Sequence, residues 1–169
     1  TLAELIDQLE RCQKALNDFM EAKRSVFPRF YFIGDDDLLE IIGQSQNPEV
    51  IQTHLKKLFQ GIHHVEFSDD KSTITAMCSV HGEVVPLSSP VTIVDDVEVW
   101  LDALCKEMVT TLSKSLVQCL RSEADLRTFP SQVLCLSENI HFTELCERAI
   151  ASGDLAGLRR RLEGQLQAY

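Results

Sequence analysis

Residues 27–33 constrain the fold of this chain more than any other stretch of its sequence. The stretch holds four of the chain's eleven aromatic residues: Phe27, Phe30, Tyr31 and Phe32. Pro28 biases the residue before it away from the α-helical conformation, so a helix that precedes it must end there. We therefore predict that residues 29–33 form a short extended segment that is too apolar to remain in water and becomes a packing centre between two helices.

The helix before this stretch is predicted over residues 2–26. Its apolar residues are spaced alternately by three and four positions, as in the seam of a coiled coil: Leu2, Leu5, Leu9, Cys12, Leu16 and Phe19. A helix within a bundle and a dimerising coiled coil both fit this spacing. The seam is short, which favours the bundle helix.

The helix after the stretch is predicted over residues 36–43, with Gly34 turning the chain into it. The run 35–37 consists of three aspartates, which could cap the helix at the positive end of its dipole or bind a divalent cation. Capping is favoured because the alternating order of a calcium loop is missing.

The remaining pattern predicts a mainly α protein. Further helices are expected at about 48–60, 97–121, 130–151 and 155–167. Residues 64–87 alternate apolar and polar side chains around two turns, with Pro86 and Pro90 stopping the third run, and this indicates a small antiparallel β meander. We expect an elongated helical bundle with this hairpin insertion, forming one unit over residues 1–169.

Composition excludes several classes of protein. The net charge of −10 argues against a nucleic-acid partner, since no basic patch is available to bind phosphates. No apolar run reaches the length of a membrane-spanning helix, so no membrane is expected. The six cysteines are scattered without a Cys-x-x-Cys pair, which favours free thiols in a reducing compartment. The chain lacks an initiator methionine and starts within a helical pattern, so we expect a fragment of a longer polypeptide.

Motifs for catalysis are missing from the sequence. It has no Gly-x-x-x-x-Gly-Lys phosphate loop, no Gly-x-Ser-x-Gly and no His-Glu-x-x-His, so no catalytic residue, cofactor or metal is predicted for this fragment. A zinc site at His63, His64, Cys78 and His81 is only weakly indicated, because structural zinc sites bring two paired ligand sets.

The stretch Phe27-Pro-Arg-Phe-Tyr-Phe32, followed by Gly34-Asp-Asp-Asp-Leu-Leu-Glu-Ile-Ile42, resembles the linker region of dynein heavy chains. The resemblance continues in family order through His54-Leu-Lys-Lys-Leu-Phe59, Gly82-Glu-Val-Val-Pro86 and Phe129-Pro-Ser-Gln-Val-Leu134. Ile33-Gly34-Asp35 is similar to the cytoplasmic types, and the run from Phe129 to Leu136 resembles the intraflagellar-transport type.

This resemblance implies a mechanical role. In dyneins, which are minus-end-directed microtubule motors, the linker is a helical rod that swings as an AAA+ ring hydrolyses ATP, with ATP and Mg²⁺ held in the ring of the parent protein. The implied partners are the rest of the same heavy chain (the ring and neighbouring linker segments), other dynein subunits and, indirectly, microtubules. The implied localisation is cytoplasmic and cytoskeletal, with a cilium or flagellum for the intraflagellar-transport type.

Two groups of residues are candidates for this role. The junction between the first two helices is a candidate hinge because proline and glycine interrupt the helices there; its residues are Phe27, Pro28, Phe30, Tyr31, Phe32, Gly34, Asp36, Leu38 and Leu39. The turns of the meander are candidates for contact with the ring through Asp69, Asp70, Lys71, His81, Gly82 and Glu83. The alternative function is a non-catalytic helical scaffold that binds partner proteins.

Overall fold

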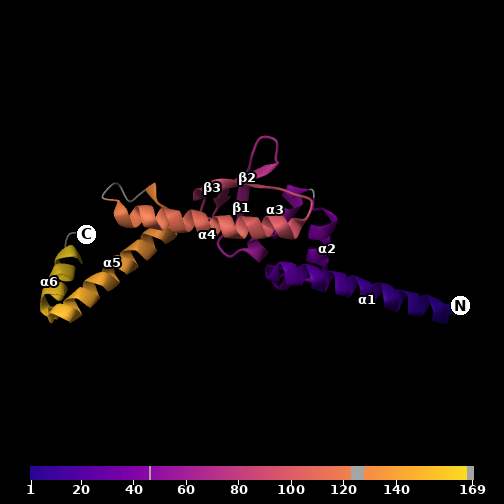
Figure 1. The fold of residues 1–169 in the computed structure, drawn as a ribbon, viewed down its shortest axis with the longest axis horizontal. Coiled ribbons are helices and arrows are strands. Elements are labelled where there is room, and N and C mark those ends of the chain that lie inside the picture. The colour runs from indigo at the N-terminus through magenta and orange to yellow at the C-terminus, as the bar shows by residue number, and fades with distance from the viewer. Residues whose placement is uncertain (46, 123–127, 167–169) are drawn as a thin grey trace. The chain divides into compact units, whose positions relative to one another are not determined.

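The computed structural model describes residues 1–45, 47–122 and 128–166, and these are mainly helical with a small three-stranded sheet (Figure 1). The helices are α1 (Leu2–Val26), the 3₁₀ helix η1 (Pro28–Phe32), α2 (Asp35–Gly43), α3 (Pro48–Leu58), α4 (Val97–Arg121), α5 (Ser131–Ser152) and α6 (Leu155–Leu166). The strands are β1 (His64–Phe67), β2 (Thr73–Cys78) and β3 (Val84–Thr92). These bounds lie within a few residues of the predicted helices and begin the sheet at the predicted residue.

The chain divides into two compact units, Thr1–Thr111 and Leu112–Tyr169, which are described separately. The first contains α1, η1, α2, α3, the sheet and the first four turns of α4. The second contains the rest of α4 together with α5 and α6, which contact each other. Gly153 ends α5 in the left-handed conformation (φ 72°), and Asp154 then caps α6 by accepting a 2.9 Å hydrogen bond from the N–H of Gly157. Gly153 thus lies between the helices that were predicted over residues 130–151 and 155–167.

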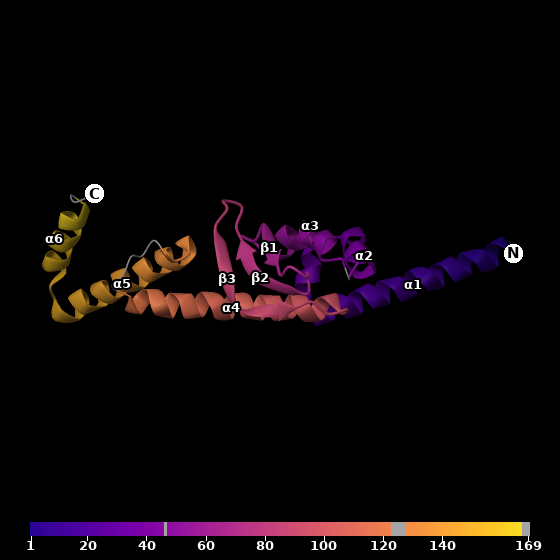
Figure 2. The same cartoon turned by 90° about the horizontal axis from the view of Figure 1, so that it is seen from above.

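The sheet is an antiparallel meander in the order β1-β2-β3, as Figure 2 shows. Its third strand continues through Pro86 and Pro90, although these prolines were predicted to end it. Proline is tolerated there because β3 is a lateral strand. The register with β2 shifts by three residues between the pairs Ile74–Val91 and Ala76–Pro86, and this produces a bulge at residues 87–90.

The bulge of β3 is bound to α4 instead of β2. The N–H of Ser88 donates a 2.9 Å hydrogen bond to Oγ1 of Thr111, and the N–H of Ser89 donates a 2.8 Å bond to Oε1 of Glu107. The Thr111 hydroxyl also donates to Glu107 at 3.1 Å. These bonds hold the sheet against the first unit's part of α4.

The core of the first unit contains side chains from η1, α2, α3, β2 and α4. Its most deeply buried side chains, all below 2% exposed, include Phe30, Leu38, Ile51, Leu55, Ile74, Trp100, Leu101 and Leu104. The seam of α1 does not join this core: Met20 is its one buried residue, and Leu2, Leu5, Leu9, Leu16 and Phe19 are 42–75% exposed. The prediction that this stripe is buried in a bundle is therefore wrong for the contacts within the first unit.

In the second unit, Val133 of α5 is buried, whereas Leu136 and Ile150 are exposed. All six cysteines are free thiols. No helix in residues 1–45, 47–122 and 128–166 combines the length and apolarity needed to cross a membrane.

Candidate functional site

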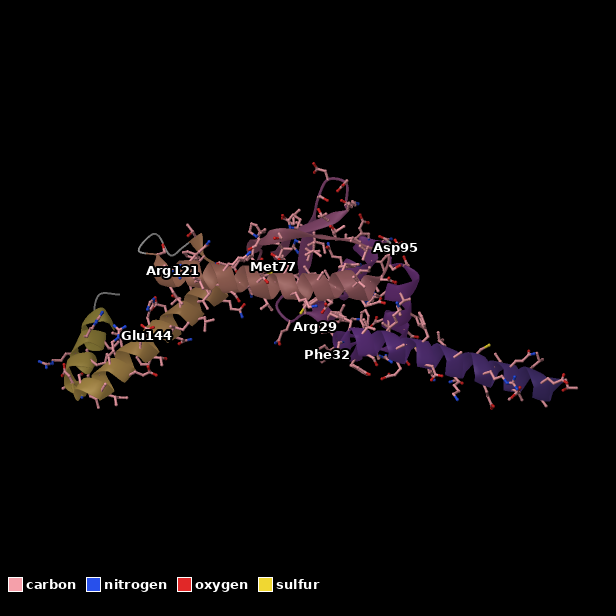
Figure 3. The ribbon with its side chains drawn as sticks, viewed as in Figure 1. Arg29, Phe32, Met77, Asp95, Arg121 and Glu144 are labelled. Carbon is pink, nitrogen blue, oxygen red and sulfur yellow. The ribbon has the colours of Figure 1, made fainter. Side chains whose placement is uncertain are left out.

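The aromatic stretch forms a 3₁₀ turn, not the predicted extended segment. A 3₁₀ helix has three residues per turn, so residues three apart share a face. Phe27, Phe30 and Ile33 accordingly point inward and are 0–5% exposed, whereas Tyr31 and Phe32 are 55% and 69% exposed. Figure 3 labels Phe32 at the C-terminal end of α1. The prediction that the whole run packs inward is therefore correct for only one of its faces.

The inward face is held together by aromatic contacts. The rings of Phe27 and Phe30 meet edge to face with centroids 5.0 Å apart, and Phe27 lies 6.4 Å from Phe59, the residue that follows α3. Edge-to-face pairs are favourable beyond the area they bury. The end of α1 is thus fixed to the end of α3 through η1.

Arg29 provides a second link between η1 and α3. The sequence patterns did not indicate Arg29 as a functional residue. Its Nη1 donates a 2.9 Å hydrogen bond to the carbonyl of Leu58, and its guanidinium lies 4.9 Å from the centroid of the Phe59 ring. Figure 3 labels Arg29. The last carbonyls of a helix lack intrahelical donors and carry partial negative charge. Arg29 therefore supplies both a hydrogen bond and a favourable charge to the C-terminus of α3, and its place within the aromatic run was the only available signal.

Polar contacts cover the outer face of the junction. Nη2 of Arg24 donates a 2.6 Å hydrogen bond to Oδ1 of Asp35 in the first turn of α2, and its guanidinium lies 5.9 Å from the Tyr31 ring. The Tyr31 hydroxyl donates to the Glu21 carboxylate, which raises the pKa of Tyr31. Two successive turns of α1 thus bind the segments that follow it.

The start of α2 differs in part from the prediction. Gly34 is the N-cap residue, and the three aspartates lie inside the first turn without a side-chain capping bond. They complement the helix dipole but do not cap it. Gly34 has φ −70° and open space around its Cβ position, so the turn does not require glycine. Among the other junction candidates, Leu38 is buried, Leu39 is partly buried, and Pro28 and Asp36 are exposed.

The junction is also connected to α4. The Lys23 ammonium bonds to the Glu98 carboxylate in the first turn of α4, and it lies 4.0 Å from Asp96. The Glu98 side chain is 8% exposed and that of Lys23 is 21% exposed. Because both partners are largely out of water, this ion pair fixes the end of α1 beside the start of α4.

The turns of the meander do not form one surface, because they lie at opposite ends of β2. Six residues of strand separate them by about 20 Å. The first turn, residues 68–72, is attached to α3 because Lys71 bonds to Glu49. The second turn, residues 79–83, closes with a 2.9 Å bond from the Ser79 N–H to the Glu83 carbonyl and lies at the end of the hairpin in Figure 2. The ring-contact candidates therefore divide into two separate sets.

Asp69 and Asp70 are both exposed in the first turn, and Asp70 organises this turn. Its carboxylate accepts hydrogen bonds from the Ser68 hydroxyl at 2.5 Å and from the N–H and hydroxyl of Ser72 at 3.1 and 2.8 Å. These donors, Ser68 first, lower the pKa of Asp70 from 3.8 to about 2. In the second turn Gly82 has φ 82°, a conformation in which glycine is favoured, and His81 is exposed.

The weakly indicated zinc ligands are not assembled into a site in the described part of the chain. His63 and His64 face each other edge to face, but Cys78 is a buried core residue and His81 lies in the exposed second turn. The one group of three possible metal ligands among the described residues is instead Asp37, Glu40 and His54. Glu40 and His54 belong neither to the aspartate run 35–37 nor to the histidine and cysteine group that indicated a metal site in the sequence.

Comparison with known proteins identifies the chain. The family model described as dynein heavy chain, N-terminal region 2, matches residues 1–119. Cytoplasmic dynein 2 heavy chain 1 of Tripneustes gratilla is 58% identical over the whole chain, and that of Mus musculus is 53% identical. The cytoplasmic dynein heavy chain of Dictyostelium discoideum is 34% identical over 99% of the chain.

The chain spans about 4% of the length of these relatives. The higher identity to the dynein 2 heavy chains agrees with the cytoplasmic, intraflagellar-transport resemblance of its motifs. The described fold presents an aromatic junction tied to α3 and α4 by named contacts, which is the part of the sequence that carried the resemblance. The chain belongs to the dynein heavy chain family, from whose N-terminal region it comes.

Proposed function

We propose that this chain is a mechanical segment of the linker of a dynein heavy chain, and that it relays ATP-driven changes of the AAA+ ring into a swing of the lever. The observation that carries this proposal is the way the end of α1 is fixed. Within a few residues it bonds to α4 through Lys23 and to α2 through Arg24, and it packs on α3 through Phe27. A helix of 25 residues is about 38 Å long, so displacement at one end is carried to this junction.

The exposed seam of α1 supports a contact with neighbouring linker segments. Five large apolar side chains lie along one face of the helix and are 42–75% exposed. Such a stripe is energetically unfavourable in water unless another surface covers it. Because the relatives are about 25 times longer than this chain, we propose that another part of the same heavy chain covers it, in a cytoplasmic, microtubule-associated motor.

The junction is proposed as the compliant part of this segment. A swing requires two packings of similar energy at a few positions that absorb the change of backbone conformation. Pro28 begins η1 and Gly34 follows it, and both are exposed, so we place the change of backbone conformation at these two positions. The two turns of the meander are proposed to contact the ring, and the first of them also bonds to α3 through Lys71.

The test replaces Gly34 and, separately, Pro28 by alanine in the full-length heavy chain. Linker swing is followed by the distance between fluorophores on linker and ring, alongside ATP turnover and microtubule gliding. We expect slower gliding with continuing ATP turnover, because the coupling changes and the chemistry does not. Gly43→Ala is the matched control, since its Cβ position is equally open at the other end of α2. Unchanged swing and gliding in both variants would contradict the hinge.

The scaffold function remains the second candidate, and the same exposed seam favours it. The scaffold function and the linker function differ in what the seam of α1 binds. A scaffold predicts that the isolated chain binds a different polypeptide with measurable affinity, and that Leu9→Ser abolishes this binding. The linker predicts instead that Leu9→Ser in the full-length heavy chain reduces gliding.

A further inference from the structure

Three side chains that could ligate a metal converge where α2 meets α3. Asp37 and Glu40 are three positions apart on α2 and therefore share a face, and His54 reaches them from α3. Nε2 of His54 lies 3.2 Å from Oε2 of Glu40, and Nδ1 lies 3.5 Å from Oδ1 of Asp37. The two helices lie side by side in Figures 1 and 2 and contact each other directly.

The imidazole of His54 is buried with an unsatisfied nitrogen. The residue is 5% exposed, and its Nδ1 has no hydrogen-bond partner among the described residues, although it points toward Asp37. A buried polar atom without a partner is rare in folded proteins and costly to stability. Its position beside two carboxylates indicates a ligand that a nitrogen lone pair can bind.

We propose that Asp37, Glu40 and His54 form a binding site for a divalent transition-metal ion of the Zn²⁺ type. The ligand atoms lie within 4.8 Å of one another. An ion bound to Nδ1 beside Asp37 requires the Glu40 carboxylate to leave Nε2 and to approach to the distance of about 2.0–2.2 Å that Zn²⁺ requires. The Glu40 side chain is 48% exposed, which gives it room for this adjustment. The site has three protein ligands, leaving one tetrahedral position for water or a further ligand.

The donor atoms determine which metal fits. Mg²⁺ and Ca²⁺ prefer oxygen ligands only, whereas an imidazole nitrogen with two carboxylate oxygens suits Zn²⁺ and its neighbours in the first transition row. The two carboxylates outnumber the ammonium of Lys57, which bonds to Asp37, so the cluster remains attractive to a cation.

Lys57 also orients one of the ligands. Its ammonium bonds to Oδ2 of Asp37 at 2.7 Å, which leaves Oδ1 directed toward His54 and lowers the pKa of Asp37. Carboxylates that ligate metals are commonly held in this way by a second group. A bound ion would join α2 to α3 directly beside the aromatic junction, and would therefore stiffen it.

The experiment titrates the 169-residue chain, with its cysteines kept reduced, with Co²⁺ as a spectroscopic probe and then displaces it with Zn²⁺. Visible absorption reports nitrogen and oxygen ligation, and a sulfur-to-cobalt charge-transfer band would reveal binding at cysteine. We expect binding without that band and a higher thermal unfolding midpoint with Zn²⁺. Glu40→Gln removes a ligand at a partly exposed position, so it should keep the fold and weaken binding by at least about tenfold.

Two controls make the result decisive. Asp36→Asn makes the same change of charge one residue from the cluster, at an exposed position, and should leave the affinity unchanged. His63→Gln removes the alternative histidine pair and should also leave it unchanged. The proposal is overturned if Co²⁺ does not bind, if binding persists undiminished in Glu40→Gln, or if His63→Gln abolishes it.

Discussion

The ammonium of Lys23, in the last turn of α1, bonds to the carboxylate of Glu98, in the first turn of α4, across 75 positions of sequence. Glu98 is almost completely buried, and its second oxygen has no hydrogen-bond partner among the described residues. The carboxylate is therefore held in a low-dielectric site by a single cation. Breaking a buried pair from one side leaves an uncompensated charge, which costs more than the pair contributes.

Lys23→Met should consequently destabilise the first unit by about 3 kcal/mol. Methionine keeps the apolar stem but removes the charge that offsets Glu98. Chemical denaturation followed by the fluorescence of Trp100, which is the only tryptophan and is 2% exposed in this unit, measures the change in the free energy of unfolding.

The double variant Lys23→Met with Glu98→Leu should recover much of that loss, since an apolar pair has no charge to desolvate. Lys106→Met is the control, because Lys106 forms an exposed pair with Asp102 on α4, and it should leave stability almost unchanged. A double variant as unstable as Lys23→Met alone would show that the buried charge is not the cause.

The two faces of η1 should respond differently to truncation. Phe30→Ala removes a completely buried ring and is expected to cost about 3–5 kcal/mol, whereas Phe32→Ala removes an exposed one and should change stability by less than about 0.5 kcal/mol. The same denaturation assay compares them. Equal effects would mean that the segment is not the 3₁₀ turn described above.

The stability contributed by Asp70 should depend on pH. Its pKa in the folded chain, about 2, lies below its ordinary value of 3.8, so the folded state favours the ionised form. The contribution is present above pH 3.8 and is lost as the pH falls toward 2. Asp70→Asn should therefore unfold at a lower temperature than the unchanged chain at pH 7, and the difference should shrink between pH 4 and pH 2.

Asp69→Asn provides the comparison within the same turn, as an exposed neighbour of equal charge. Its difference from the unchanged chain should vary less with pH over this range. The midpoint of thermal unfolding, measured by circular dichroism at each pH, gives both curves. A constant difference for Asp70→Asn would contradict the assigned hydrogen bonds from Ser68 and Ser72.

The helices were predictable because their signals are local. Pro48 begins α3 and Gly153 ends α5, and both act through their own backbone preferences. The family was predictable as well, from the motif that contains η1 and α2. Local signals failed where two backbone conformations can bury the same apolar residues. Residues 28–32 could bury one side as a strand or as a 3₁₀ turn, and the contact with Phe59 favours the turn.

The polar part of the site depends on contacts between distant residues. Nothing adjacent to Lys23 indicates Glu98, and nothing adjacent to Asp37 indicates His54, because each pair forms only after separate helices meet. Similarly, Pro86 and Pro90 favour an end to β3, but the side chains of Thr111 and Glu107 supply acceptors that allow the strand to continue. Such compensation between distant segments leaves no periodic signal.

The attachment of the β3 bulge to α4 has a consequence for solubility. A lateral strand with unsatisfied N–H groups can recruit a strand from another molecule and so begin edge-to-edge aggregation. In β3, Pro86 and Pro90 have no N–H to offer, and the N–H groups of Ser88 and Ser89 are already bound to Thr111 and Glu107. Four of the nine residues of this strand are thereby closed to intermolecular pairing, which protects the sheet while the chain remains folded.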